Sequence, residues 1–325
     1  TRYIGVTGVQ TCALPIWIYD AAWNGWFMFA SPILSNAPKG TWIPEDEWPV
    51  DWFNALQDDY KLTEFFHGEE TRAMPISCFS MLLPDTIVGQ MDALKELAAL
   101  SVSGGGVGLH NAIRATSDKA PGPIPYAKVI DGAIGYFQQS KNRRGACAFY
   151  MDVSHPDIIE HIRFRVPSGG DSARKSDNRT QFHNAVNITD EFINAVNNDY
   201  QFNLVCPHTG EIRESVNARS LWHEILEVRA VTGEPYLFKI DTANKALPST
   251  QKSLGLKING SNLCNEIALP TSEERTFVCC LSSLNLEKYT EWENSTLVAD
   301  LVQYLDNVIQ FFIEQAPLEL SKAVA

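Results

Sequence analysis

Residues 259–267, NGSNLCNEI, place an amide, a thiol and a carboxylate at alternate positions behind an Asn-Gly turn signal. If this segment is extended, Asn262, Cys264 and Glu266 point to one face, because successive side chains of a strand alternate. An amide orients hydroxyl groups, a carboxylate accepts a proton, and a thiol is a nucleophile, a metal ligand or a redox centre. Taken alone, such a triplet more often belongs to an edge strand with a buried structural cysteine.

The composition excludes several classes of protein. The chain has 325 residues, 45% of them hydrophobic and 20% charged, which suffices for one large α/β domain or two smaller ones. No apolar run approaches the roughly 20 residues of a membrane span. The formal net charge of -13 argues against nucleic acid and anionic lipid as partners, since both are negatively charged. We therefore expect a protein that binds neither, and the pattern of cysteines described next indicates a cytoplasmic one.

The cysteines do not form the framework of a small secreted domain. Their number is odd, they are widely spaced, and no CxxC pair occurs, which argues against a zinc ribbon or a thioredoxin-type site. We expect reduced thiols, with any disulfide transient and catalytic. His155, His161 and His183 lack a compact metal-ligand spacing and are interpreted as structural, so no metal site is expected. The cysteines are Cys12, Cys78, Cys147, Cys206, Cys264, Cys279 and Cys280.

Two segments are set apart from the rest. Residues 6–16, VTGVQTCALPI, lack the sustained apolar region of a signal peptide. They back-translate to a sequence that resembles a short-read sequencing adapter, so residues 1–16, with Cys12, are interpreted as non-native. Residues 37–72 combine Pro, Gly and acidic positions, which indicates a surface insertion.

The remaining pattern predicts helices alternating with strands, and therefore a parallel α/β sheet. Asp85 stands near the expected start of the first helix, Gly233 near the end of the fourth, and Asn294 or Ser295 at the start of the fifth. The helices are expected at 84–100, 125–140, 154–164, 218–233 and 294–315, and the strands after the Gly-rich run 101–108 and at 146–153, 183–189 and 234–241.

The Gly-rich run SGGGVG, residues 103–108, is not a nucleotide fingerprint. It lacks the Lys-Ser/Thr of a P-loop and follows a predicted helix rather than a strand. Cysteines are more informative in combination, because PISCF carries Cys78 and FVCCLSSLNL carries Cys279 and Cys280. These thiols and Cys264 converge if their segments end at one pocket.

Together these motifs resemble the catalytic subunit of class I ribonucleotide reductase. FASPILSN, PISCF, SGGGVGLHNAIRA, RRGACAFYMDVSHPDI, TGEPYLFKIDTANKALP, SNLCNEIALP and CLSSLNL follow the family's order across residues 17–286. The resemblance implies that residues 17–325 form the first half of a ten-stranded α/β barrel with a central finger loop, as in glycyl-radical enzymes. It implies reduction of ribonucleoside diphosphates by thiyl-radical chemistry, for DNA precursor synthesis.

The resemblance also implies roles for single residues. Cys264 matches the cysteine that becomes a thiyl radical and takes the 3′ hydrogen, Glu266 the base for the 3′-hydroxyl, and Asn262 the amide that holds the ribose. Cys78 and Cys279 match the pair that reduces the 2′ carbon and ends as a disulfide, although Cys280 stays an alternative to Cys279. The implied substrate contacts are Ser31, Ser77, Gly105 and Gly106, and the implied effector contacts are Asp85, Ser101, Arg114, Gln139 and Arg143.

The partners follow from the same resemblance. They are a metal-containing small subunit that generates the radical, a second large subunit, and thioredoxin or glutaredoxin as reductant. No cofactor is bound directly, and deoxynucleotides or ATP act as allosteric effectors. The chain lacks the N-terminal ATP cone and stops soon after the finger loop, so we expect it to be inactive alone.

Two alternatives stay open. The adenosylcobalamin-dependent reductases share the barrel and the cysteines, but commonly show NPCGE where this chain has NLCNEI. A non-catalytic fragment that binds deoxynucleotides is the other. A neighbouring gene for a ferritin-like small subunit would distinguish them.

Overall fold

The computed structural model describes residues 17–36, 74–138, 144–166 and 182–324. They divide into two compact units, Thr1–Ser77 with Cys280–Pro317, and Cys78–Cys279 with Leu318–Ala325. The expectations for residues 1–16, for the insertion at 37–72, and for Gln139 and Arg143 lie outside the described residues.

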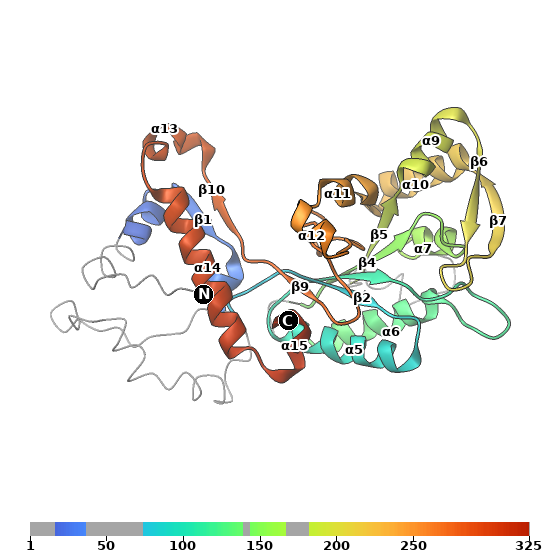
Figure 1. Cartoon of the computed structure of the whole chain (residues 1–325), viewed down its shortest axis with the longest axis horizontal. Helices are drawn as coiled ribbons and strands as arrows, with labels where there is room; N and C mark the ends of the chain where they lie inside the picture. The colour runs from blue at the N-terminus through green and yellow to red at the C-terminus, as the bar shows by residue number, and fades with distance from the viewer. Residues whose placement is uncertain (1–16, 37–73, 139–143, 167–181, 325) are drawn as a thin grey trace. The chain divides into compact units, whose positions relative to one another are not determined.

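The second unit is built on a six-stranded sheet (Figure 1). Five neighbouring strands are parallel, and the sixth, at one edge, is antiparallel. Their order across the sheet is β8 (Tyr236–Lys239), β5 (Phe182–Ile188), β4 (Cys147–Asp152), β3 (Val107–Asn111), β2 (Phe79–Leu83) and β9 (Phe277–Val278). The predicted parallel α/β architecture is confirmed, as a curled half-barrel sheet; the antiparallel edge was not predicted.

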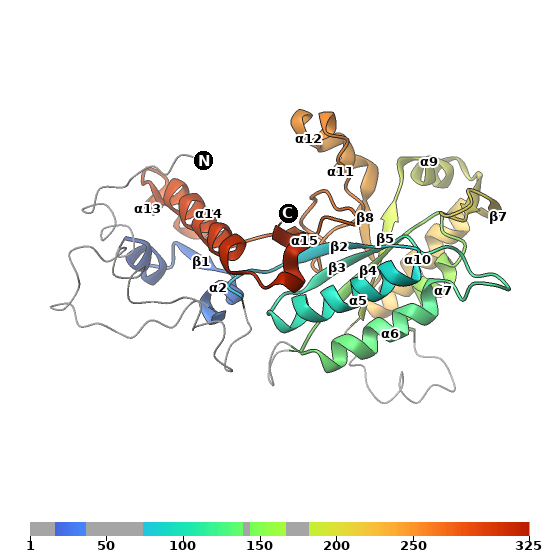
Figure 2. The same ribbon diagram turned by 60° about the horizontal axis from the view of Figure 1, so that its bottom comes forward.

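Helices connect the parallel strands and cover the sheet. The two long crossovers, α5 (Ile87–Val102) and α6 (Pro123–Tyr136), lie side by side along one face, as Figure 2 shows. The helices α7 (Ile158–Arg163) and α10 (Ala218–Thr232) follow β4 and β7, whereas α11 (Ile240–Ala246) and α12 (Ser249–Ser253) stand on the opposite side of the sheet (Figures 1 and 2). That opposite face is the one that carries the loop 259–267.

Some of the residues that cap the helices are those expected from the sequence, and others are not. Gly233 ends α10 in the left-handed conformation, with φ 80°, as predicted. The cap of α5 is Thr86, whose hydroxyl accepts the Gly89 N–H at 3.0 Å, and not Asp85. At the start of α14 (Leu297–Gln315) the cap position is Thr296, and the neighbouring Ser295 accepts the Leu297 N–H at 3.2 Å.

Several elements of the second unit were not predicted. Among them are α9 (Asp190–Asn198), the antiparallel hairpin of β6 (Gln201–Val205) and β7 (Ile212–Asn217), and the elements β2, β9, α11 and α12. The signal for α9 is present, because Thr189 caps it through the Phe192 N–H and two acidic residues occupy its first turn. Strand β6 alternates exposed polar with buried apolar residues, so its signal is present in the sequence, whereas β7 has no buried residue and shows no such alternation.

The first unit is small. Its strands β1 (Phe27–Phe29) and β10 (Ser282–Leu284) pair antiparallel, and a core of Ile18, Ala21, Phe27, Trp292, Leu297 and Leu301 joins them to α14. Of the helices within the described ranges, none has both the length and the apolar character to cross a membrane. The remaining short elements of this unit are α2 (Ser31–Asn36), η2 (Leu286–Lys288) and α13 (Tyr289–Trp292), whereas η3 (Leu318–Leu320) and α15 (Ser321–Val324) belong to the second unit.

Candidate active site

The loop 259–267 is a turn and not the extended strand that the alternation suggested. The Asn262 side-chain oxygen accepts the backbone N–H groups of Glu266 and Ile267, both at 3.1 Å. Asn265 lies in the left-handed region with φ 67°, and its N–H approaches the Asn262 carbonyl at 3.3 Å. A side-chain bond to the backbone thus competes with strand pairing and folds the loop. Asn262 and Glu266 meet through this turn.

The loop lies directly on the sheet. The Tyr150 hydroxyl donates to the Asn262 carbonyl at 2.7 Å. A Cβ on Gly108 would stand 1.9 Å from the Ser261 carbonyl oxygen, so only glycine permits this approach. The Gly-rich run therefore lets the protein's own backbone come close, which is a role that the sequence did not indicate.

Two further glycines of this run were expected to contact substrate through their backbones. A Cβ on Gly105 would stand 2.0 Å from the Phe79 ring, and one on Gly106 would stand 2.3 Å from the Leu263 side chain. Protein side chains thus fill the space beside both glycines. The predicted substrate contacts remain predictions.

Cys78 and Cys279 face each other across the antiparallel edge of the sheet. Cys78 precedes β2, Cys279 follows β9, and the pairing of these strands continues to them: the Cys279 N–H donates to the Cys78 carbonyl at 2.9 Å. The Cys279 sulfur accepts the Cys78 N–H, also at 2.9 Å. Both are buried. Cys280 belongs to the first unit, where burial raises its pKa to about 11.

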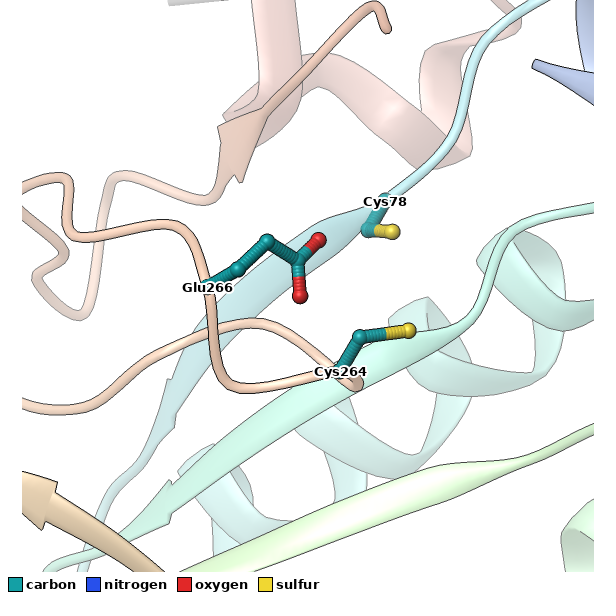
Figure 3. A group of neighbouring side chains, drawn as sticks. All are labelled: Cys78, Cys264 and Glu266. Atoms are coloured by element: carbon teal, nitrogen blue, oxygen red, sulfur yellow. The ribbon is translucent and has the colours of Figure 1, made fainter. Parts of the chain in front are cut away.

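Cys264 completes the group. The sulfurs of Cys78 and Cys264 and a carboxylate oxygen of Glu266 lie within 4.8 Å of one another, and Figure 3 shows them approaching a common space. The Asn262 amide donates to Glu266 Oε1 at 2.7 Å and so orients the carboxylate. Asn262 is fully buried, whereas Cys264 and Glu266 are exposed. The structure therefore brings together the five predicted catalytic residues.

The electrostatics of this cluster keep the thiols of Cys264 and Cys279 protonated. The hydrogen bond with Cys78 raises the pKa of Cys264, and loss of solvent and the negative charge of Glu266 add to the shift. The same hydrogen-bond partner and burial raise the pKa of Cys279. Protonated thiols are poor nucleophiles, but they retain the S–H bonds from which hydrogen atoms transfer. The arrangement suits hydrogen-atom chemistry better than nucleophilic attack.

Alkylation kinetics test this electrostatic state. Because the pKa of Cys264 lies above its usual value of 9.0, we expect iodoacetamide to modify Cys264 more slowly than a free thiol at pH 8, despite its exposure. The rate should keep rising with pH above 9, where the rate of an ordinary thiol levels off. Glu266→Gln removes a negative charge, lowers the pKa and should accelerate the reaction. Peptide mapping by mass spectrometry measures the rate. A rate at pH 8 equal to that of a free thiol would contradict the raised pKa of Cys264.

The Asn262 side chain is expected to stabilise the turn. Asn262→Ala leaves two partly buried N–H groups without their acceptor, so the free energy of unfolding should fall by roughly 1–3 kcal/mol. Asn198→Ala is the matched control, because Asn198 is exposed and bonds only within its own helix; about 0.5 kcal/mol or less is expected there. Urea denaturation measures both, and equal losses would count against the role of Asn262.

The predicted effector residues separate into two places. Asp85 receives the Arg114 N–H at 2.9 Å and the Arg114 Nε–H at 2.8 Å, and His208 of the β6–β7 turn lies 3.0 Å away. Ser101 is buried near the far end of α5 and donates to the Phe137 carbonyl at 2.6 Å. Since 16 helical residues span about 24 Å, Ser101 does not join Asp85 and Arg114.

The remaining predicted residues have local explanations. Ser31 starts α2 and is exposed, and Ser77 is buried directly before Cys78; both belong to the first unit. The structural interpretation of the histidines fits their surroundings. His155 and His161 are buried with Nε2 3.0 Å from a carbonyl oxygen, and burial lowers the pKa of His161 to about 4. His183 Nδ1 lies 2.6 Å from Glu234 Oε1.

Comparisons with known proteins agree with this geometry. Residues 76–323 match the family model of the ribonucleotide reductase barrel domain. A putative ribonucleoside-diphosphate reductase large subunit of Frog virus 3 (isolate Goorha) is 45% identical over 301 residues, which cover 92% of this chain and 47% of that protein. The large subunit of Invertebrate iridescent virus 3 is 36% identical over 312 residues, covering 79% of this chain and 49% of the relative.

A solved structure gives the same result. The class Id ribonucleotide reductase alpha subunit of Actinobacillus ureae superposes with a TM-score of 0.70 and 27% sequence identity, over 94% of this chain and 48% of that one. The chain thus spans about half the length of the relatives it matches.

Proposed function

Because the chain belongs to the ribonucleotide reductase large-subunit family, we propose that it contributes the finger loop and the reducing thiols to the reduction of ribonucleoside diphosphates. The product is the deoxyribonucleoside diphosphate. The observation that carries the proposal is the convergence of Cys78, Cys264 and Glu266 within 4.8 Å, next to Cys279.

The proposed reaction begins at Cys264. Its thiyl radical takes the hydrogen atom from C3′ of the ribose, so that an S–H bond forms and a C–H bond breaks. Glu266 accepts the proton of the 3′-hydroxyl, which favours departure of the 2′-hydroxyl. That group leaves as water with a proton from the thiol pair.

Cys78 and Cys279 supply the electrons. The two thiols give two electrons and the hydrogen for C2′, and they end as a disulfide, which an external dithiol must reduce before the next turnover. Glu266 returns its proton to the 3′ oxygen, and Cys264 returns its hydrogen atom to C3′ and is again a thiyl radical. The net change is one ribonucleotide and two thiols to one deoxyribonucleotide, one disulfide and one water.

The geometry supports this division of roles. Cys279 and Cys78 are opposite each other on paired strands, where a disulfide needs Cα atoms about 4.4–6.8 Å apart. Cys264 lies on the turn. The Tyr150 hydroxyl bonds this turn at the Asn262 carbonyl, and Gly108 lets the backbone at Ser261 and Asn262 lie close to β3. Asn262 is placed to fix Glu266, and in the proposed complex also the ribose hydroxyls.

A chimera tests the function. Residues 76–323 replace the aligned segment of the Frog virus 3 relative, and this barrel chimera is mixed with ribonucleoside diphosphate, a dithiol, an effector and a class I small subunit that activates the unmodified relative. Deoxynucleotide over multiple turnovers is the expected product. An inactive barrel chimera beside an active relative would refute the proposal. Activity that requires adenosylcobalamin instead of the small subunit would favour the alternative class. That the 325-residue chain alone is inactive remains a prediction.

The partners and effectors belong to the same proposal. A radical-generating small subunit, a second large subunit and thioredoxin or glutaredoxin are its proposed partners, and deoxynucleoside triphosphates or ATP its effectors. Asp85 and Arg114, joined by an ion pair of 2.8 Å, are the described residues proposed to hold an effector.

Effector binding depends on Asp85 in this proposal. Asp85→Ala removes a charged acceptor, so deoxynucleoside triphosphate binding should weaken by roughly 1.5–3 kcal/mol, measured by calorimetry on the chain. Ser101→Ala is the control, because Ser101 lies at the other end of α5; it should leave binding unchanged. Undiminished binding by the Asp85 variant would place the effector elsewhere.

A further inference from the structure

The catalytic cluster has the composition of a site for a soft metal ion. Two sulfurs and one carboxylate oxygen, from Cys78, Cys264 and Glu266, lie within 4.8 Å of one another. Within the described part of the chain, no other three His, Cys, Asp or Glu side chains approach each other in this way. Thiolate and carboxylate ligands together select zinc-like ions over magnesium or calcium, which prefer oxygen alone.

The spacing of the donors is close to that of a bound ion. Zinc takes sulfur at about 2.3 Å and oxygen at about 2.0–2.2 Å, so its tetrahedral ligand atoms stand roughly 3.3–3.8 Å apart. A contraction of at most about 1–1.5 Å therefore converts the present spacing into a coordination shell. Cys264 and Glu266 are exposed on the turn, so rotation of their side chains supplies this movement.

Hydrogen bonds from neighbouring residues fix the positions of two of the three metal donors, Glu266 and Cys78. Asn262 bonds Glu266 Oε1 at 2.7 Å and leaves the second carboxylate oxygen for an ion. Cys78 is held through its backbone, because its N–H donates to the Cys279 sulfur and its carbonyl accepts the Cys279 N–H, each at 2.9 Å. The exposed side of the cluster admits water as a fourth ligand.

We propose that the reduced chain binds one Zn²⁺ ion through Cys78, Cys264 and Glu266. This ion blocks the site reversibly. The Cys78 sulfur, while it holds zinc, is not available for a disulfide with Cys279, and Cys264 binds zinc as a thiolate, its displaced proton passing to solvent, so it has no S–H bond left for hydrogen-atom transfer. The binding itself is independent of whether the chain reduces nucleotides.

Cobalt is the probe that tests the site. The reduced, tag-free 325-residue chain is titrated with Co²⁺, and absorption from sulfur-to-cobalt charge transfer is recorded before and after Zn²⁺ is added. We expect one Co²⁺ per chain, a near-ultraviolet thiolate band, and full displacement by one equivalent of Zn²⁺. No thiolate band, or a band that Zn²⁺ does not remove, would overturn the proposal.

Three variants assign the ligands. Cys264→Ser should weaken Zn²⁺ binding by roughly 100-fold or more. Loss of a residue that only hydrogen-bonds to a ligand costs roughly 10–100-fold, and loss of the ligand itself costs more. Glu266→Gln also removes a direct ligand; it should weaken Zn²⁺ binding by roughly 100-fold or more and keep the thiolate band, because both sulfurs remain. Both residues are exposed, so the fold should tolerate the changes, which circular dichroism checks. Cys280→Ser is the matched control with unchanged affinity; a loss there equal to that of Cys264→Ser would contradict the assignment.

Discussion

Replacing Cys264 by serine in the barrel chimera is expected to abolish ribonucleotide reduction. An O–H bond is much harder to convert to a radical than an S–H bond, so the first hydrogen transfer from C3′ cannot begin. We expect a loss of at least roughly 10⁴-fold in turnover, which corresponds to about 5.4 kcal/mol in the activation barrier. The exposed position of Cys264 on the turn means that this change alters few packing contacts.

Substrate binding separates a chemical effect from a structural one. The variant should bind ribonucleoside diphosphate with the affinity of the parent, measured by calorimetry, and Cys280→Ser should retain turnover. Deoxynucleotide formation by Cys264→Ser at more than a trace would show that another group carries the radical. Loss of both binding and turnover would instead place Cys264 among the residues that maintain the loop.

Replacing Gly108 by alanine is expected to displace the finger loop. The added Cβ would stand 1.9 Å from the Ser261 carbonyl and 2.9 Å from backbone atoms of Asn262, and backbone cannot rotate away as a side chain does. Overpacking of this kind costs roughly 1–3 kcal/mol or more in unfolding free energy. The bond from Tyr150 to the Asn262 carbonyl should break as the loop lifts, and reduction in the barrel chimera should fail.

Gly132→Ala is the matched control. Gly132 lies within α6, and a Cβ built there meets nothing within 4 Å. Alanine is favoured over glycine in a helix by roughly 1 kcal/mol, so this variant should be slightly more stable than the parent. Thermal unfolding of both variants measures these changes in stability. A Gly108 variant as stable as Gly132→Ala would mean that the loop does not rest on β3.

The sequence predicted most of what is local. The helices α5, α6 and α10 and the strands β3, β4 and β5 follow from periodicity, and the chemical residues of the finger loop stand within five positions of one another. Cys78 and Cys279 were placed in the same pocket by resemblance. The structure supports that placement, because a single antiparallel pairing of β2 with β9 puts the two cysteines opposite each other.

What the sequence did not predict depends on contacts between distant segments. The role of Gly108 follows from its distance to Ser261, a residue of another segment, and the shape of the loop follows from Asn262 bonding backbone that a strand would pair elsewhere. His208 approaches Asp85 from the turn of a hairpin whose second strand, β7, shows no clear alternation in the sequence. Each of these features depends on a particular contact, either a close backbone approach or a side-chain hydrogen bond, and the periodicity of the sequence carries no information about such contacts.

A single turnover without external reductant tests the assignment of the active site most directly. The reduced barrel chimera and its small subunit are given ribonucleoside diphosphate, the deoxynucleotide is counted, and the thiols are then alkylated and mapped by mass spectrometry. We expect one Cys78–Cys279 disulfide for each deoxynucleotide formed, with Cys264 and Cys280 recovered as thiols. Deoxynucleotide formed while Cys78 and Cys279 both remain thiols, or a disulfide that contains Cys264, would contradict the assignment.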